Sequence, residues 1–306
     1  MQFHIKHATR YRYTRPVFCE PMTIRLRPRE DAAQRLLRYN LWIDPQPAGM
    51  SDYVDVDGHT ATQVWFDQPA TTLSIVVSSV VETLRTNPFD YLLSPEGLTA
   101  PLRYNDTVRL ALLPYLQQGE AEPEVVAAAD RILKVCGGRL PAFLTELTLW
   151  LNAEFPRYVR LDGPPLEPVE TLRQQSGTCR DLTQLFNAIC RSVGLAARFV
   201  SGYHEREDSE GRRFLHAWSE VYLPGAGWRG YDPTAGLAVA DRHVALAASA
   251  SPVLAAPTCG TFRGNGAESS MDTQLVIRTV ERGDPVEQPL HAHFSLADAV
   301  IDSGSR

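Results

Sequence analysis

Apolar and polar side chains alternate along much of the first 85 residues. The clearest alternating stretches cover residues 3–7, 22–26 and 37–43. Alternation over four to eight residues is typical of a strand with one buried face. Two further apolar stretches, 54–56 and 64–66, flank Asp57-Gly58, a dipeptide that is favoured in tight hairpin turns. These patterns predict a β-sandwich domain over residues 1–86.

The spacing of apolar residues changes further along the chain. Residues 87–105 contain three prolines and one glycine without a clear period, and we interpret them as a linker. Beyond them, helical spacing predicts helices over residues 123–136 and 140–155. A third helix, which Gly194 ends, is predicted from apolar residues that share one face. These residues are Leu182, Leu185, Phe186, Ile189 and Val193.

Three strands are expected after the third helix, over residues 197–203, 215–223 and 228–232. Helices followed by antiparallel strands are typical of an α+β domain. We therefore expect an α+β core over residues 106–281. Residues 282–306 are weakly patterned and are expected to form a C-terminal tail without regular structure.

Composition and charge narrow the class of protein. Of the 306 residues, 44% are hydrophobic and 22% are charged, as in globular proteins. The net charge of −6 argues against broad nucleic-acid binding. The sequence has neither an apolar run long enough for a membrane span nor the N-terminal apolar stretch of a secretory signal. We therefore expect a cytoplasmic protein without nucleic-acid or membrane partners.

Cysteine and arginine usage add two expectations. The five cysteines are odd in number and lack CxxC or CxxH spacing, so they predict neither a disulfide framework nor a zinc site. We expect no metal and no cofactor. We interpret the arginines of the N-terminal strands as a solvated sheet face; they are Arg10, Arg12, Arg15, Arg25, Arg27 and Arg29.

One cysteine stands where an irregular stretch enters the third predicted helix. Cys179 lies at the N-terminus of that helix, where aligned peptide dipoles favour the thiolate, the nucleophilic form of the side chain. Gly177 lets the chain turn sharply because it has no Cβ. The N–H groups of the first helical turn are suited to stabilise an oxyanion. Taken alone, a cysteine at such a place is more often structural.

Two residues that lie much further along the chain change this interpretation. His216 lies on a predicted strand and Asp232 ends the next one. If the strands pair as a hairpin, Asp232 lies near His216 and can hold the imidazole in the tautomer that accepts the thiol proton. A cysteine, a base and an orienting carboxylate together form an activated nucleophile. Trp218 points to the same side of its strand as His216 and is a candidate for the substrate-binding wall as well as for the core.

Several segments, taken in order, carry a resemblance to a known family. The segments Gly177–Cys179, Arg191–Tyr203, His216–Trp218 and Tyr231–Thr234 resemble the transglutaminase core. The whole chain, residues 3–280, is similar to bacterial transglutaminase-like proteins with an N-terminal β domain. The N-terminal matches are His7–Tyr13, Leu26–Arg29 and Asp55–Gly58.

The resemblance implies a papain-like α+β core in which Cys179 is the nucleophile, His216 the general base and Asp232 the orienting residue. It also implies an enzyme that acts on an amide or peptide bond of a peptide or protein substrate through a thioester. Water or an amine can resolve that thioester. We favour hydrolysis by a cysteine peptidase or amidase, because bacterial members of this type are often suspected proteases, over amine transfer by a transglutaminase.

The chain departs from the family pattern at three places. Arg180 stands where glutamine is common, His59 stands where asparagine is common, and Ala247–Ser251 replaces a Gly-Arg-Asp-Tyr element. The last change is expected to alter the wall of the cleft. Two other functions stay open. One is another acyltransferase, such as an arylamine N-acetyltransferase, although its Arg-Gly-Gly-x-Cys motif is absent; the other is a non-catalytic binding protein with a vestigial cleft.

Overall fold

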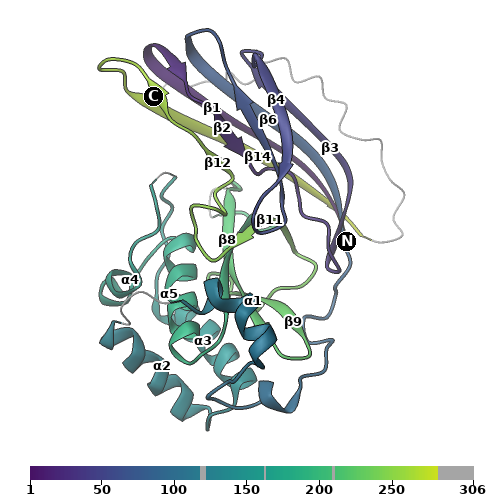
Figure 1. Cartoon of the computed structure of the whole chain (residues 1–306), viewed down its shortest axis with the longest axis vertical. Coiled ribbons are helices and arrows are strands. Elements are labelled where there is room, and N and C mark those ends of the chain that lie inside the picture. The colour runs from purple at the N-terminus through teal and green to yellow at the C-terminus, as the bar shows by residue number, and fades with distance from the viewer. Residues whose placement is uncertain (118–121, 162, 209–210, 282–306) are drawn as a thin grey trace.

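The computed structural model describes residues 1–117, 122–161, 163–208 and 211–281. The predicted tail, 282–306, lies outside the described residues. Figure 1 shows a β-sandwich at the top, a group of helices at the bottom, and the strands of a separate sheet, which belongs to the α+β core, between them. Within the described residues, no helix combines the length and the hydropathy that a membrane span requires.

The N-terminal domain consists of two antiparallel sheets. Its strands are β1 (Gln2–Cys19), β2 (Met22–Ile24), β3 (Gln34–Asp44), β4 (Gly49–Val54), β5 (Thr60–Trp65) and β6 (Ala70–Thr83). β1 pairs with β6, which pairs with β3, whereas β2, β5 and β4 belong to the second sheet. Phe3, Ile5 and Ile24 are among the buried residues of the core that the two sheets share. The predicted sandwich and the β4–β5 hairpin are confirmed.

The C-terminal strands return to this sandwich. They are β12 (Thr258–Cys259), β13 (Phe262–Arg263) and β14 (Ser269–Val280). β14 pairs with β1 over twelve residues, from Gln2↔Val280 to Tyr13↔Ser269. We expected the α+β core to extend to residue 281. That expectation is wrong for β14, because this strand completes a sheet of the N-terminal domain. A pairing across the whole chain cannot be read from local alternation.

Among the described residues, five α-helices and one short 3₁₀ helix precede the sheet of the α+β core. The α-helices are α1 (Asp106–Leu116), α2 (Pro123–Val135), α3 (Leu140–Glu154), α4 (Pro168–Gln174) and α5 (Cys179–Ser192). The 3₁₀ helix spans Pro95–Gly97. The predictions of α2, α3 and α5 are confirmed, whereas α1 and α4 lie in stretches where no helix was predicted. The apolar face of α5 is buried as expected, with Leu185 and Phe186 fully inaccessible.

The core sheet has the order β10-β9-β8-β7-β11, and all of its pairings are antiparallel. Its strands are β7 (Ala197–His204), β8 (Leu215–Leu223), β9 (Gly227–Asp232), β10 (Leu237–Ala238) and β11 (His243–Ser249). Residues of α5 and of β7 and β8 share one apolar cluster. Tyr203, Val244 and Leu246 instead join the apolar cluster of the sandwich. The sandwich is therefore packed directly against β7 and β11.

Side chains of the sandwich bond to the backbone of β11, the edge strand of the core sheet. The Gln34 amide nitrogen donates to the Ala245 carbonyl oxygen at 2.9 Å, and the Ala245 N–H donates to the Gln34 oxygen at 2.7 Å. His59 Nε2 lies 2.9 Å from the Ala248 backbone nitrogen. These bonds cover groups that an open sheet edge would leave unpaired.

A buried ion cluster also joins the two domains. Arg29 of the N-terminal domain lies 2.7 Å from Glu220 on β8, which lies 2.6 Å from Arg198 on β7. The Arg29 and Glu220 side chains are each 10% exposed. Arg25 is also buried, against Asp55. The expected solvated face is therefore wrong for Arg25 and Arg29, because each has a carboxylate partner that lies far away in the sequence.

The segment 87–105, expected to be a linker, is packed onto the core at its C-terminal end. Leu102 and Tyr104 are buried in the apolar cluster of the helices. The Tyr104 hydroxyl donates to the Tyr222 carbonyl oxygen at 2.8 Å and accepts from the Ala196 N–H at 3.0 Å. This end of the segment therefore belongs structurally to the core.

Candidate active site

The helix α5 begins at Cys179 because its first turn is capped. Thr178 is the N-cap residue, and its side chain accepts from the Asp181 N–H while the Asp181 carboxylate accepts from the Thr178 N–H. This reciprocal capping box satisfies N–H groups that have no partner inside the helix. It fixes Cys179, the residue directly after the N-cap, at the first helical position.

Asp181 holds this helix start against the rest of the core. Its carboxylate is fully buried and accepts from Arg160 at 2.7 Å and from the Leu166 N–H at 2.8 Å. A Cβ on Gly177 would lie only 2.9 Å from the Asp181 Cβ. Gly177 is therefore needed for close packing against the cap, whereas we expected it to provide a sharp turn.

The half-buried Cys179 thiol faces the hairpin of β8 and β9. Burial raises its pKa, but the hydrogen bond and charge of His216 outweigh that effect, with smaller help from the Ala217 backbone and Arg180. The net result is a thiol whose pKa is lowered from its usual value. A lowered pKa increases the thiolate fraction, which is the reactive form.

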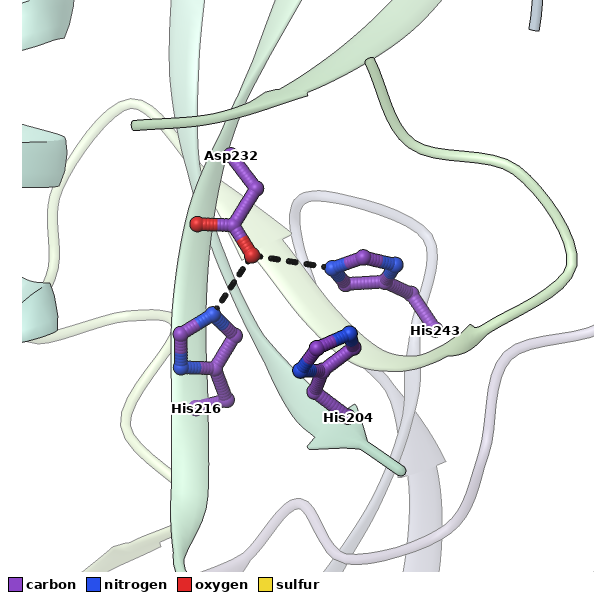
Figure 2. A group of neighbouring side chains, drawn as sticks. All are labelled: His204, His216, Asp232 and His243. Carbon is purple, nitrogen blue, oxygen red and sulfur yellow. Dashed lines mark hydrogen bonds and ion pairs between the residues drawn. The ribbon is translucent and has the colours of Figure 1, made fainter. Parts of the chain in front are cut away.

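His216 and Asp232 lie side by side because β8 and β9 pair as predicted. His216 Nε2 lies 2.7 Å from Asp232 Oδ2 (Figure 2). Since Cys179 also bonds to His216, the remaining ring nitrogen, Nδ1, is the one available to the thiol. Burial lowers the pKa of His216, but the charge and hydrogen bond of Asp232 and the interaction with Cys179 raise it to about 10. The arrangement thus favours a thiolate–imidazolium pair.

The Asp232 carboxylate is fully buried and every contact favours its charged form. Its Oδ1 accepts from the backbone N–H groups of Thr234 and Ala235 at 2.9 and 3.0 Å. Its Oδ2 faces His216 and also His243, whose Nε2 lies 2.9 Å away. Burial opposes ionisation, yet the two histidines hold the pKa of Asp232 well below its usual value. Asp232 is therefore a fixed negative charge behind the imidazole.

A cavity of about 860 Å³ opens beside these residues. Cys179 and His216 lie in its wall, together with the loop residues Arg157–Leu161 and the half-buried His204. The opposite side is supplied by the sandwich, whose lining residues include Tyr11 on β1. The volume is within the range of ligand pockets, roughly 300–1,000 Å³. The candidate site thus lies between the two domains.

Comparison with known protein families gives two matches along the chain. Residues 3–82 match the bacterial transglutaminase-like N-terminal region. Residues 128–233, which include Cys179, His216 and Asp232, match the transglutaminase-like superfamily. This protein belongs to the transglutaminase-like superfamily.

Relatives that match most of the chain are found in mycobacteria. The uncharacterized protein ML0607 of Mycobacterium leprae is 26% identical over 292 residues, which cover 87% of this chain and 95% of that protein. The uncharacterized protein Rv2569c of Mycobacterium tuberculosis is 26% identical over 294 residues, which cover 90% of this chain and 92% of that protein. Among solved structures, a putative cysteine protease from Cytophaga hutchinsonii is similar with a TM-score of 0.67 and 18% identity, covering 94% of this chain and 93% of that one. The transglutaminase-like fold with its N-terminal β domain is therefore shared along nearly the whole chain.

The structure brings together the three residues that sequence reasoning selected in the transglutaminase-like core, but it places Trp218 elsewhere. Trp218 is 1% exposed and is not part of the described cavity lining. It packs against Val200 and Ala245 beneath the imidazole rings. The candidate role of Trp218 in substrate binding is corrected to a core position, because its side chain is buried between residues of β7 and β11.

The altered segment 247–251 of the transglutaminase-like core also lies behind the cavity. Ala247 and Ala248 are fully buried on β11. The described lining instead contains residues that follow them, Pro252, Val253 and Ala256. The expectation that segment 247–251 alters the cleft wall is therefore wrong, because none of its residues is in the described lining.

Sequence reasoning missed three residues that support the site. Asp181 had a local signal, since Thr178-Cys179-Arg180-Asp181 has the spacing of a capping box. His204 and His243 had none. They become neighbours because β7 and β11 pair with His204 opposite His243, and this register depends on the folded sheet.

Proposed function

We propose that this protein is a Cys-His-Asp thiol enzyme that cleaves amide or peptide bonds through a thioester, as a cysteine peptidase or amidase. The observation that carries the proposal is the alignment of the Cys179 thiol, His216 and buried Asp232 in the wall of a large cavity. Geometry and pKa directions agree, because both favour a thiolate beside an imidazolium.

In the first step, the Cys179 thiolate attacks the carbonyl carbon of the substrate. The resulting oxyanion would lie near the N-terminus of α5, where the Cys179 N–H has no acceptor inside the helix. The imidazolium of His216 then gives its proton to the leaving nitrogen, the C–N bond breaks, and a thioester remains. Asp232 supports the charged ring until this proton has left.

In the second step, neutral His216 takes a proton from water as the water attacks the thioester. The carbon–sulfur bond breaks, the carboxylic acid leaves, and Cys179 is restored beside a protonated His216. A primary amine in place of water would give a new amide, as in a transglutaminase. The structural similarity to a putative cysteine protease supports water as the acceptor.

The position of the cavity supports a peptide as the substrate. The cavity lies between the core and the sandwich, and side chains from both domains line it. Its walls combine apolar residues such as Phe199 and Val253 with arginines such as Arg157. A surface of this kind can bind both the side chains and the polar backbone of an extended chain.

The proposal is tested by incubating the protein with a peptide library, with and without an added primary amine, and analysing the products by mass spectrometry. We expect cleaved peptides and a transient acyl adduct on Cys179. Both should be absent from the Cys179→Ala variant. Amine adducts in place of cleaved peptides would instead identify amine transfer. Neither product, together with no adduct on the wild-type cysteine, would favour the non-catalytic binding protein.

A further inference from the structure

Three imidazoles and one carboxylate converge behind the candidate nucleophile. The side chains of His204, His216, His243 and Asp232 each offer a ligand atom, and these atoms all lie within 4.8 Å of one another. The rings of His204 and His243 are stacked at 4.3 Å between centroids, and the ring of His204 lies 5.5 Å from that of His216. Figure 2 shows the three rings gathered on the Oδ2 side of Asp232.

We propose that these four residues form a binding site for a zinc ion, and that an occupied site switches the enzyme off. Imidazole nitrogen and carboxylate oxygen are ligands that zinc prefers, and four of them suffice for a tetrahedral site. Ligand atoms at zinc distances of about 2.0–2.1 Å are about 3.3 Å apart in a tetrahedron. The cluster therefore needs only a modest rearrangement: the Asp232 contacts with His216 and His243 lengthen from 2.7 and 2.9 Å, and the widest separations, which are at most 4.8 Å, shorten.

The burial of the cluster fits a site that is open on one side. Asp232 and His243 form its closed side, with side chains that are 0% and 1% exposed. His204 and His216 are half-buried and lie in the wall of the cavity. An ion can reach these two histidines from the cavity and then meet the two buried ligands behind them.

Zinc would take the place of protons that now hold the cluster together. The contacts of Asp232 Oδ2 with His216 Nε2 and His243 Nε2, at 2.7 and 2.9 Å, are hydrogen bonds. A bound ion would release those protons to solvent. The His216 ring would then be bound through Nε2 and keep its remaining proton on Nδ1, the edge that faces Cys179. In that state it can neither accept the thiol proton nor return one to a leaving amine.

His204 distinguishes the proposed zinc site from a site formed by the catalytic residues alone. His204 has no role in the proposed cleavage. Unlike His216 and His243, it also forms no bond with Asp232 in the described contacts. Zinc that bound only through Cys179 and His216, as it can in any thiol enzyme, would not depend on His204. The dependence on His204 therefore distinguishes the proposed site from binding at the thiol.

The test measures zinc binding to the full-length Cys179→Ala variant by isothermal titration calorimetry. We expect one ion per chain with a micromolar or lower dissociation constant. His204→Leu in the same background should weaken binding at least about tenfold, because even the loss of a residue that only supports a metal ligand weakens metal sites by about 10–100-fold. His4→Leu is the matched control, because His4 lies on β1 beside Gln2 and should leave zinc binding unchanged. His204→Asn, with thermal melting of every variant, guards against a folding defect.

Cobalt binding gives a second measurement, since a tetrahedral cobalt site has a strong visible absorption that should weaken with His204→Leu. No zinc binding, or equal affinity with and without His204, would overturn the site. The inhibition rests on the proposed function and is tested separately, as loss of wild-type cleavage on adding zinc and its recovery with a chelator. Binding without inhibition would overturn the switch. A wild-type protein that cleaves nothing even without zinc would overturn the proposed function and leave the binding result standing.

Discussion

Two buried carboxylates on neighbouring strands of one sheet have opposite kinds of partner. Glu220 on β8 and Asp232 on β9 both have a pKa held below its usual value, because the charges and hydrogen bonds of basic side chains outweigh the cost of burial. The partners of Glu220 are two arginines, from the core and from the sandwich. Those of Asp232 are two histidines.

The difference lies in whether the partner can give up a proton. An arginine stays charged at every physiological pH, so the Glu220 cluster is a permanent ionic connection between two domains. A histidine can give up its proton to a reacting group and take it back, so the Asp232 cluster can support proton transfer. Similar burial of a carboxylate thus serves structure at one site and, in our proposal, chemistry at the other. Each prediction below tests this contrast.

The largest effect is expected from removing the proton carrier. His216→Ala should lower cleavage of an amide by about 10⁴-fold or more, nearly as much as Cys179→Ala. The loss should be much smaller for an activated ester, whose leaving group needs no proton. Single-turnover acylation with both substrates measures this difference. Equal losses for ester and amide would show that His216 is not the general acid.

Removing the structural carboxylate should affect stability. Glu220→Gln leaves Arg29 and Arg198 buried without their shared negative partner, at an expected cost of about 3–5 kcal/mol in the free energy of unfolding. Urea denaturation measures the loss. Glu124→Gln, which breaks an exposed ion pair with Arg173, is the matched control and should change little. At a temperature where Glu220→Gln stays folded, its kcat should remain near the wild-type value; a large fall would remove the contrast with Asp232.

The matched change at the other carboxylate should affect activity. In Asp232→Asn, the backbone N–H groups of Thr234 and Ala235 would keep the amide oxygen at the Oδ1 position. The amide nitrogen would then face His216 and disfavour its imidazolium. We expect kcat for an amide to fall on the order of 10²–10³-fold, or about 3–4 kcal/mol of transition-state stabilisation. An unchanged kcat would show that Asp232 does not act on His216.

A smaller effect is expected from acid, which should reduce the contribution of the Glu220 cluster to the free energy of unfolding. The folded pKa of Glu220 lies below its ordinary value of about 4.3, so its stabilising contribution is complete above that pH and is lost as the pH falls towards the folded pKa. Below pH ~4, the wild type should lose up to about 1.4 kcal/mol per pH unit more than Glu220→Gln. Urea denaturation of both proteins at pH 7, 4 and 3 measures the difference. Parallel curves would show that the Glu220 pKa is not depressed by folding.

Local sequence patterns predicted much of this structure. The face of α5, the start of that helix at Cys179 and the β8–β9 hairpin follow from periodicity and from short-range order. The hairpin places Asp232 beside His216, whereas the position of Cys179 next to them was implied by the resemblance to the transglutaminase core. The three residues lie within one stretch of helix and hairpin, which is why the candidate site was accessible to sequence reasoning.

Apart from α1, α4 and the Asp181 cap, the features that sequence reasoning missed depend on distant contacts. β14 pairs with β1 across the whole chain, Arg29 meets Glu220 across the domain boundary, and His204 meets His243 through the register of β7 and β11. A strand pattern specifies which face of a strand is buried, but it does not specify the neighbouring strand. The burial of Trp218 also depends on neighbouring strands. One alternating pattern fits a tryptophan in the cavity wall as well as one in the core.

The central claim, that Cys179 is an activated nucleophile, is tested most directly by iodoacetamide labelling at pH 6, mapped by mass spectrometry. The account predicts that Cys179 reacts before Cys259, although Cys259 is exposed and Cys179 is only half-buried. This order should disappear in His216→Ala, where the lowered thiol pKa loses its main cause. Labelling of Cys259 first in the wild-type protein, or an order that does not change in His216→Ala, would contradict the account.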